Sequence, residues 1–253
     1  MDEFCTHHHG FRWLCGAVSV NYHSLADFRV EHLEFLDDVL THSVAVLLEE
    51  NLVDLNRVAQ DGRRVRASAG AASFRRQPTL AECLQEAQTQ VQRLRAEGET
   101  DPSATNRQPQ RAQERAARER DERVRAALER MPELEAKKKS DEKAKARVST
   151  TDPEATVMKR ADGGFRPAYN VQFSTATVGQ VLVGVEVTTS GSDMGQLAPL
   201  VEQVHDRYAV YPKDVLTDGG FPKHDDIEAV SVPEKGCVVY APVPEPKDPK
   251  QDR

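Results

Sequence analysis

The stretch Asp214-Val-Leu-Thr-Asp-Gly-Gly-Phe221 places a carboxylate, that of Asp218, directly after a short apolar run. The run predicts a buried strand that ends before Asp218, and residues 224–230 predict a helix after the turn. A strand end holds a carboxylate rigidly, and carboxylate oxygens are preferred ligands of hard divalent cations. The sequence therefore predicts that Asp218 is a metal ligand.

The segments upstream predict two strands and a helix. Residues 168–175 and 180–188 alternate apolar and polar side chains, as a strand with one buried face does. In the first of them, Val171 and Phe173 are the apolar members of this alternation. Residues 192–208 carry apolar side chains at helical spacing. The order strand, strand, helix, strand and aspartate is typical of the middle of an RNase H-like α/β domain.

A second Asp-Gly pair lies far upstream, at Asp61 and Gly62. The segment from Arg57 to Gly62 predicts a short strand that ends at Asp61, and residues 65–70 alternate in the manner of a further strand. We expect residues 57–76 to form the first strand or hairpin of the same α/β fold, with Asp61 as a second candidate ligand.

Several motifs occur together and in a fixed order. They are Cys15-Gly-Ala-Val-Ser-Val-Asn-Tyr-His23, Val58-Ala-Gln-Asp-Gly-Arg-Arg-Val-Arg-Ala-Ser-Ala69, Thr151-Asp-Pro-Glu-Ala155, Ala161-Asp-Gly-Gly-Phe-Arg-Pro-Ala-Tyr-Asn-Val-Gln172, Ser190-Gly-Ser-Asp-Met-Gly-Gln-Leu197 and Leu216-Thr-Asp-Gly-Gly-Phe221. With these motifs the chain resembles DDE-type transposases of bacterial insertion sequences, over residues 13–242. The chain departs from the family at one position. A small residue usually follows the first Asp-Gly pair in the family, whereas Arg63 follows it here.

The resemblance implies metal-dependent DNA cleavage and strand transfer. In such enzymes two aspartates on central strands and a glutamate on a later helix hold Mg²⁺ or Mn²⁺, and water and then a DNA 3′-hydroxyl act as nucleophiles. By the motif match, Asp61 is the first aspartate and Asp218 the second. The implied partners are DNA at the element ends and at the target, and the oligomeric state stays open, a homo-oligomer included.

The third acid has no clear counterpart in this sequence. The segment after the predicted last strand, 237–241, is rich in proline and offers only Glu245, Asp248 and Asp252. We expect the catalytic glutamate to be absent and the chain to be a fragment of a transposase, cut at both ends, with little or no transposition activity. The alternatives are a remnant that binds DNA or a transposase without catalysis, and a remnant that does not fold stably.

The aspartates also have simpler interpretations. Asp-Gly is a frequent turn pair, which applies to both Asp61 and Asp218. A further Asp-Gly-Gly-Phe begins at Asp162 but follows no apolar run, so we interpret it as a turn before the strand at 168. Asp193 is interpreted as an early residue of the 192–208 helix, where the helix dipole favours a carboxylate.

Composition divides the chain into five segments. Residues 1–56 predict part of an N-terminal helical domain, with the single tryptophan, Trp13, in its core. Residues 57–76 predict the first strand region, residues 77–148 a charged helical insertion, residues 149–243 the remainder of the RNase H-like domain, and residues 244–253 a disordered tail.

Basic side chains gather in parts of a chain whose net charge is −7. Residues 107–147 carry more basic than acidic residues, which is consistent with a solvated helical face or with contacts to the DNA backbone. A second group flanks Asp61 and is predicted to bind DNA: Arg63, Arg64, Arg66, Arg75 and Arg76. A uniformly DNA-coating protein is excluded by the net charge, so any nucleic-acid surface must be local.

The four cysteines are widely separated and form no Cys-x-x-Cys pair, which argues against a metal cage or a disulfide framework. No apolar run is long enough to span a membrane, and the N-terminus lacks the features of a signal peptide. We expect a cytoplasmic protein with no membrane partner.

Overall fold

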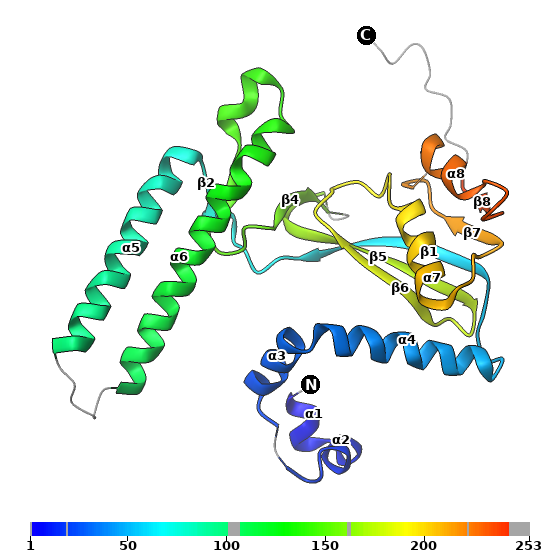
Figure 1. Cartoon of the computed structure of the whole chain (residues 1–253), viewed down its shortest axis with the longest axis horizontal. Coiled ribbons are helices and arrows are strands. Elements are labelled where there is room, and N and C mark those ends of the chain that lie inside the picture. The colour runs from blue at the N-terminus through cyan, green and yellow to red at the C-terminus, as the bar shows by residue number, and fades with distance from the viewer. Residues whose placement is uncertain (1, 19, 101–106, 161–162, 222, 243–253) are drawn as a thin grey trace.

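The computed structural model describes residues 2–18, 20–100, 107–160, 163–221 and 223–242. The predicted tail at 244–253, the alternative aspartate Asp162 and the acidic residues at 245, 248 and 252 lie outside the described residues. Within the described part the chain is a mixed α/β protein built on one curled sheet (Figure 1).

Helices come first along the chain, followed by a long strand and a helical hairpin. The elements are α1 (Asp2–His7), α2 (His9–Leu14), α3 (Tyr22–Glu31), α4 (Leu33–Glu49), β1 (Asp54–Arg66), a 3-10 turn (Ala71–Ser73), β2 (Phe74–Arg75), α5 (Gln77–Thr100) and α6 (Arg107–Ala136). The remainder is a 3-10 segment (Ser140–Lys145), β3 (Val148–Ser149), β4 (Thr156–Lys159), β5 (Phe165–Val178), β6 (Leu182–Thr188), α7 (Leu197–Tyr208), β7 (Asp214–Thr217), α8 (His224–Val230) and β8 (Val238–Tyr240).

The main sheet runs β6-β5-β1-β7-β8, and β4 pairs with the first part of β5 on the same edge as β6. Strand β5 is antiparallel to β1, β4 and β6, whereas β1, β7 and β8 are mutually parallel neighbours. The short strands β2 and β3 form a separate pair. The long strand β1 therefore joins the antiparallel half of the sheet to its parallel half.

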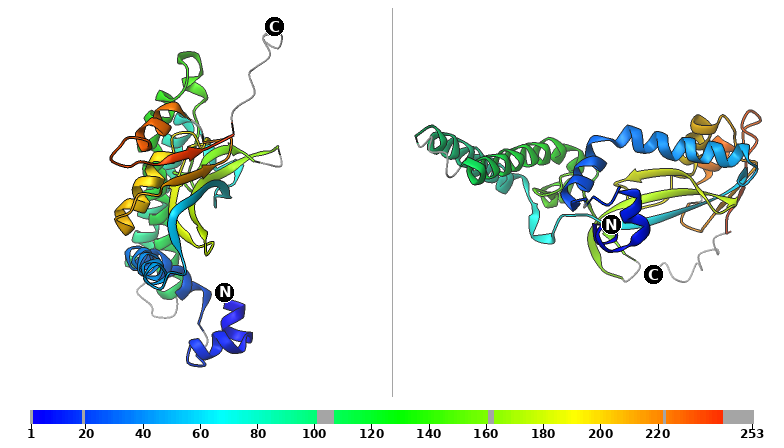
Figure 2. Two further views of the ribbon diagram at one scale, coloured as in Figure 1. Left: turned by 90° about the vertical axis from the view of Figure 1, so that its right-hand side faces the viewer. Right: turned by 90° about the horizontal axis from the view of Figure 1, so that it is seen from below.

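One face of the sheet carries the helices. Figure 2 shows α4, α7 and α8 on the same side, and their apolar side chains form a single core with that face. Its fully buried members include Val58 of β1, Val215 of β7 and Leu200 of α7. Burying each such side chain contributes about 1.5–3 kcal/mol, so this contact fixes the position of α7 on the sheet. The predicted apolar stripe of that helix is confirmed for Leu197, Leu200, Val201 and Val204, which are all buried. It is wrong for Met194, which precedes the helix and is exposed.

The loop before β8 is tied to α7 by a charged contact. Lys235 and Tyr211 both donate hydrogen bonds to the Glu202 carboxylate. The hydrogen bond from Lys235 lowers the pKa of Glu202, and the same bond raises the pKa of Lys235. The pair links α7 to the segment that leads into the last strand.

The charged insertion is a helical hairpin of α5 and α6 that extends away from the sheet (Figure 1). Its interface uses small and slender residues, among them Ala87, Ala117 and Val124, so the helices approach closely. Leu80 and Met131 lie near its base and pack against Val148 of β3. Much of the charge along the hairpin is paired within it, for example Arg115 with Glu119 and Arg125 with Asp121.

Two structural expectations drawn from the sequence are wrong. Strand β1 does not end at Asp61; it begins at Asp54 and continues to Arg66, because β5 supplies hydrogen-bond partners along that whole length. Trp13 is not a core residue: 81% of it is exposed, since no residue of α2 is buried.

Among the described residues no helix is both long and apolar enough to traverse a bilayer.

Candidate functional site

The two predicted ligands, Asp61 and Asp218, each follow the last paired residue of β1 and β7. These strands are parallel, and Gln60 lies opposite Thr217 in their register. The next residue along each strand is the aspartate, so Asp61 and Asp218 occupy neighbouring positions, where adjacent strands are about 4.8 Å apart. Asp218 follows the last residue of β7, as predicted, and both aspartates are exposed.

Asp61 projects from the face of the sheet opposite to α7. It pairs with Phe173, whereas the next residue, Gly62, pairs with Gln172. Successive side chains of a strand point to opposite faces, and Gln172 is fully buried on the α7 side. Asp61 therefore faces away from the helix-covered core and is accessible.

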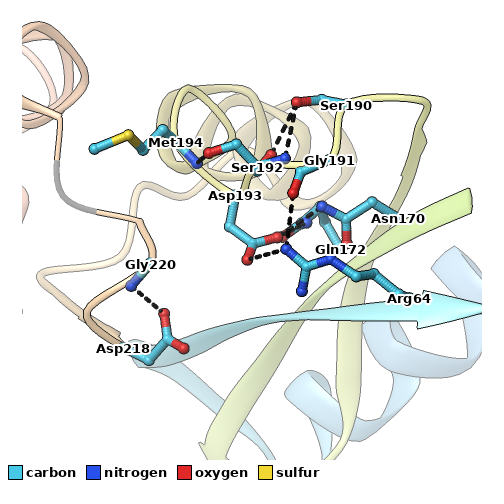
Figure 3. A network of polar contacts seen from close by, with 10 residues as sticks. All are labelled: Arg64, Asn170, Gln172, Ser190, Gly191, Ser192, Asp193, Met194, Asp218 and Gly220. Atoms are coloured by element: carbon cyan, nitrogen blue, oxygen red, sulfur yellow. Dashed lines mark hydrogen bonds and ion pairs between the residues drawn. The ribbon is translucent and has the colours of Figure 1, made fainter. Parts of the chain in front are cut away.

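The Asp218 carboxylate is fixed by its own turn. Its Oδ1 accepts a hydrogen bond of 2.8 Å from the backbone N–H of Gly220 (Figure 3). Asp side chains that accept from the N–H two residues on stabilise turns of this kind. This contact uses Oδ1, and it orients the carboxylate at the end of β7.

A third aspartate, Asp193, lies buried beside this junction. Only 9% of the residue is exposed. Its Oδ1 accepts hydrogen bonds of 2.7 Å from the side-chain amides of Asn170 and Gln172, and its Oδ2 lies 3.5 Å from the Arg64 guanidinium (Figure 3). Arg64 also donates to the carbonyl of Gly191 at 2.9 Å. The carboxylate is thus held from both β5 and β1.

The interpretation of Asp193 as an early helix residue is wrong. Helix α7 begins at Leu197, and Asp193 belongs to the loop before it. Hydrogen bonds within residues 188–194 shape this loop: Ser192 accepts from the N–H of Met194, and Ser190 accepts from the N–H of Ser192. The loop carries the carboxylate to the sheet instead of presenting it to a helix terminus.

Gly62 permits this approach. A Cβ atom at Gly62 would lie 2.3 Å from Oδ1 of Asp193 and 2.6 Å from Nε2 of Gln172. Both distances are far shorter than any van der Waals contact, so a side chain at this position would displace the carboxylate. Because Gly62 has no side chain, the Asp193 carboxylate can lie against the backbone of β1.

Asp193 and Asp218 also converge on Gly220. A Cβ atom at Gly220 would lie 3.1 Å from Oδ1 of Asp218 and 3.4 Å from Oδ2 of Asp193. The two carboxylates consequently lie close to the same backbone position, and Figure 3 shows both of them beside Gly220. Asp193 thus adjoins the residue after Asp61 on one side and the Asp218 turn on the other.

The buried face of β5 is polar near this site, contrary to expectation. Asn170, Gln172 and Ser174 are fully buried, whereas Val171 and Phe173 on the other face are only half-buried. Within the described residues, several buried side-chain oxygen atoms of β5 and of its neighbours β1 and β7 have no protein hydrogen-bond partner: Asn170 Oδ1, Gln172 Oε1, Ser174 Oγ, Gln60 Oε1 and Thr217 Oγ1. Such a row is typical of a functional network rather than of an apolar core.

The predicted DNA-binding arginines do not lie together. Arg63 is exposed on the same face of β1 as Asp61, whereas Arg64 points to the other face and is engaged by Asp193. Arg66 ends β1, and Arg75 pairs with Val148 at the base of the hairpin, followed by Arg76; all three are exposed.

The three aspartates supply hard oxygen donors, which suit Mg²⁺ or Mn²⁺. Within the described ranges, no three His, Cys, Asp or Glu side chains are gathered closely enough to form a metal site by themselves. The structure brings the predicted pair Asp61 and Asp218 to adjacent positions and adds Asp193, whose role the sequence analysis missed. The available signal was the position of polar residues at 170, 172 and 174, which alternate along a central strand.

Comparisons of the chain with protein-family models, with curated proteins and with solved structures found no match.

Proposed function

We propose that this chain is the RNase H-like portion of a DDE-type transposase, acting on DNA with Mg²⁺ or Mn²⁺ held by Asp61 and Asp218. The observation that carries the proposal is the register of β1 and β7, in which Gln60 faces Thr217 and the two aspartates follow as neighbours. Support also comes from the strand order β6-β5-β1-β7-β8, with an antiparallel half and a parallel half.

Each of the two aspartates offers carboxylate oxygens, the donor type that a divalent cation prefers. Asp61 is exposed on a central strand, Asp218 is exposed at the end of its parallel neighbour, and Oδ1 of Asp218 is held by Gly220. A bound divalent ion would supply a Lewis acid for a phosphoryl oxygen and lower the pKa of a coordinated water. Arg63, two residues from Asp61 on the same face, is placed to bind a phosphate of the DNA backbone.

The supporting role falls to Asp193. Its two amide partners and Arg64 hold it rigidly beneath Gly62, and it flanks Gly220 of the Asp218 turn. It therefore fixes the backbone that carries each of the two ligands. A third ligand on a later helix, which the resemblance implies, corresponds to no residue of the described range, and we expect the chain alone to be a slow nuclease.

DNA nicking tests the proposal. We expect supercoiled plasmid to be nicked slowly with Mn²⁺ and not with EDTA, and the activity to fall to background in Asp61→Asn and in Asp218→Asn. Asp206→Asn, an exposed position on α7, is the matched control and should nick as the wild type does. Equal nicking by all four proteins would contradict the assignment of the ligands.

The second candidate function is DNA binding without catalysis. It is favoured by the exposed cations at the base of the α5–α6 hairpin, which lie apart from the carboxylates. Under this alternative the wild type binds DNA in EDTA, in a salt-sensitive manner, and nicks no plasmid with Mn²⁺.

A further inference from the structure

A basic cleft lies where the helical hairpin joins the sheet. Lys137 and Lys138 line it from the residues directly after α6, and Lys145 and Arg147 line it from the segment that leads into β3. Its remaining walls come from the 3-10 turn, β2, α6 and β4, and they are largely apolar: Ala71, Phe74, Leu134, Ala155, Thr156 and Val157. None of the residues that line the cleft is acidic.

Among the described residues, two of the four cations of this cleft form ion pairs and two do not. Lys137 pairs with Glu133 and Lys145 with Glu142, both of which lie outside the cleft lining. For Lys138 and Arg147, both exposed, no ion pair occurs with any described side chain. Farther along the hairpin, some arginines are paired within one helix: Arg93 with Glu97, Arg115 with Glu119, Arg118 with Glu114 and Arg125 with Asp121.

Neighbouring cations extend the positive surface. Arg75 of β2 lies opposite Val148 of β3. Arg147 directly precedes Val148 in the chain, so Arg75 and Arg147 are neighbours. Lys139 and Lys143 flank the cleft on the connection between α6 and β3, and both are exposed. In a protein with a net charge of −7, this concentration of positive charge is local.

We propose that this cleft, centred on Lys138 and Arg147, binds the phosphate backbone of double-stranded DNA. Lysine and arginine contacts to phosphates position DNA without reading its sequence, and such contacts need positive charge that is not already neutralised. Single-stranded DNA would require aromatic side chains for base stacking. The cleft holds one aromatic residue, Phe74, and it packs half-buried against Ala67, Ala69 and Ala155.

This inference rests on the proposed function, because it assumes a substrate made of DNA. The cleft belongs to the hairpin base, whereas Asp61 and Asp218 belong to the junction of β1 and β7. The two sites can therefore be changed separately. Binding by the cleft requires no metal ion, so it can be measured in EDTA, where cleavage is absent.

Duplex binding as a function of salt tests the proposal. Fluorescence anisotropy of a labelled oligonucleotide duplex, titrated with the full chain in EDTA over a series of salt concentrations, gives the dependence of log K on log salt. In the double variant Lys138→Gln with Arg147→Gln, the magnitude of this negative slope should decrease by roughly 2, about 1 for each lost phosphate contact. Binding should weaken roughly 10- to 100-fold at about 0.1 M salt.

A charge-matched control separates a local site from a general loss of charge. Arg93→Gln with Arg115→Gln removes two cations that are already paired along the hairpin. This control should keep the wild-type slope and bind within about twofold of the wild type. Circular dichroism should show unchanged helix content in both double variants.

Several results would overturn the cleft assignment. They are an unchanged slope in the Lys138/Arg147 variant, an equal loss in the Arg93/Arg115 control, preferential binding of single strands or of an acidic peptide, and no wild-type binding at low salt. If the wild type nicks DNA but the salt dependence of binding does not change in the Lys138/Arg147 variant, the proposed function is supported and the cleft assignment is wrong. If the cleft binds DNA but the wild type nicks none, the cleft assignment is supported and the proposed function is wrong.

Discussion

Replacing Asp193 with alanine is expected to lower the free energy of unfolding by about 3 kcal/mol. The substitution leaves the buried amides of Asn170 and Gln172 without their shared acceptor and leaves Arg64 without its carboxylate. Removing one member of a buried charged network costs more than the network contributes in total, because the remaining groups stay desolvated. Asp193→Asn keeps the shape and one acceptor oxygen, so its cost should be smaller.

Urea unfolding followed by circular dichroism measures this difference. Asp206→Ala serves as the control, because Asp206 is a highly exposed carboxylate on α7 and its loss should change stability by less than about 0.5 kcal/mol. An Asp193→Ala protein as stable as the control would show that the carboxylate does not hold β1, β5 and the loop before α7 together.

The second large effect is expected at Gly62. In a strand, replacing glycine with alanine normally stabilises by about 0.5–1 kcal/mol, because glycine loses more backbone entropy on folding. Here a Cβ atom would lie 2.3 Å from Asp193 Oδ1 and 2.6 Å from Gln172 Nε2. Those atoms are held by short hydrogen bonds and cannot withdraw freely, so Gly62→Ala should destabilise by about 1–3 kcal/mol.

Gly70→Ala is the matched control, because a Cβ there meets nothing within 4 Å and the backbone φ is −89°. A thermodynamic cycle locates the cause of the Gly62 effect. In an Asp193→Ala background the main clash is gone, so Gly62→Ala should cost at least about 1 kcal/mol less than in the wild type. Additive effects of the two substitutions would contradict the contact between them.

The elements that local pattern determines could be predicted from the sequence. Helix α8 has the predicted bounds, and β5, β6 and β7 lie where alternation or a short apolar run placed them. The position of Asp218 after a strand is confirmed as well. These features depend on side-chain periodicity and on the Gly-Gly turn, which are visible in a single segment.

The features that depend on tertiary contacts could not be predicted. The length of β1 beyond Asp61 requires β5, which follows about a hundred residues later in the chain. The burial of Asp193 requires amides from β5 and the absence of a side chain at Gly62, so nothing near Asp193 in the sequence indicates it. The buried polar face of β5 reverses the usual rule for a half-buried strand, since the polar residues serve that carboxylate.

The central claim is that Asp61 and Asp218 share one divalent ion, and iron-directed cleavage tests it most directly. Fe²⁺ takes the place of Mg²⁺ at oxygen ligands, and with ascorbate and peroxide it cuts the polypeptide beside the site that holds it. We expect cuts next to both Asp61 and Asp218, suppressed by excess Mg²⁺ or Mn²⁺, and lost together in either Asp61→Asn or Asp218→Asn. Cuts confined to other parts of the chain, or cuts at one aspartate that persist when the other is replaced, would contradict the claim.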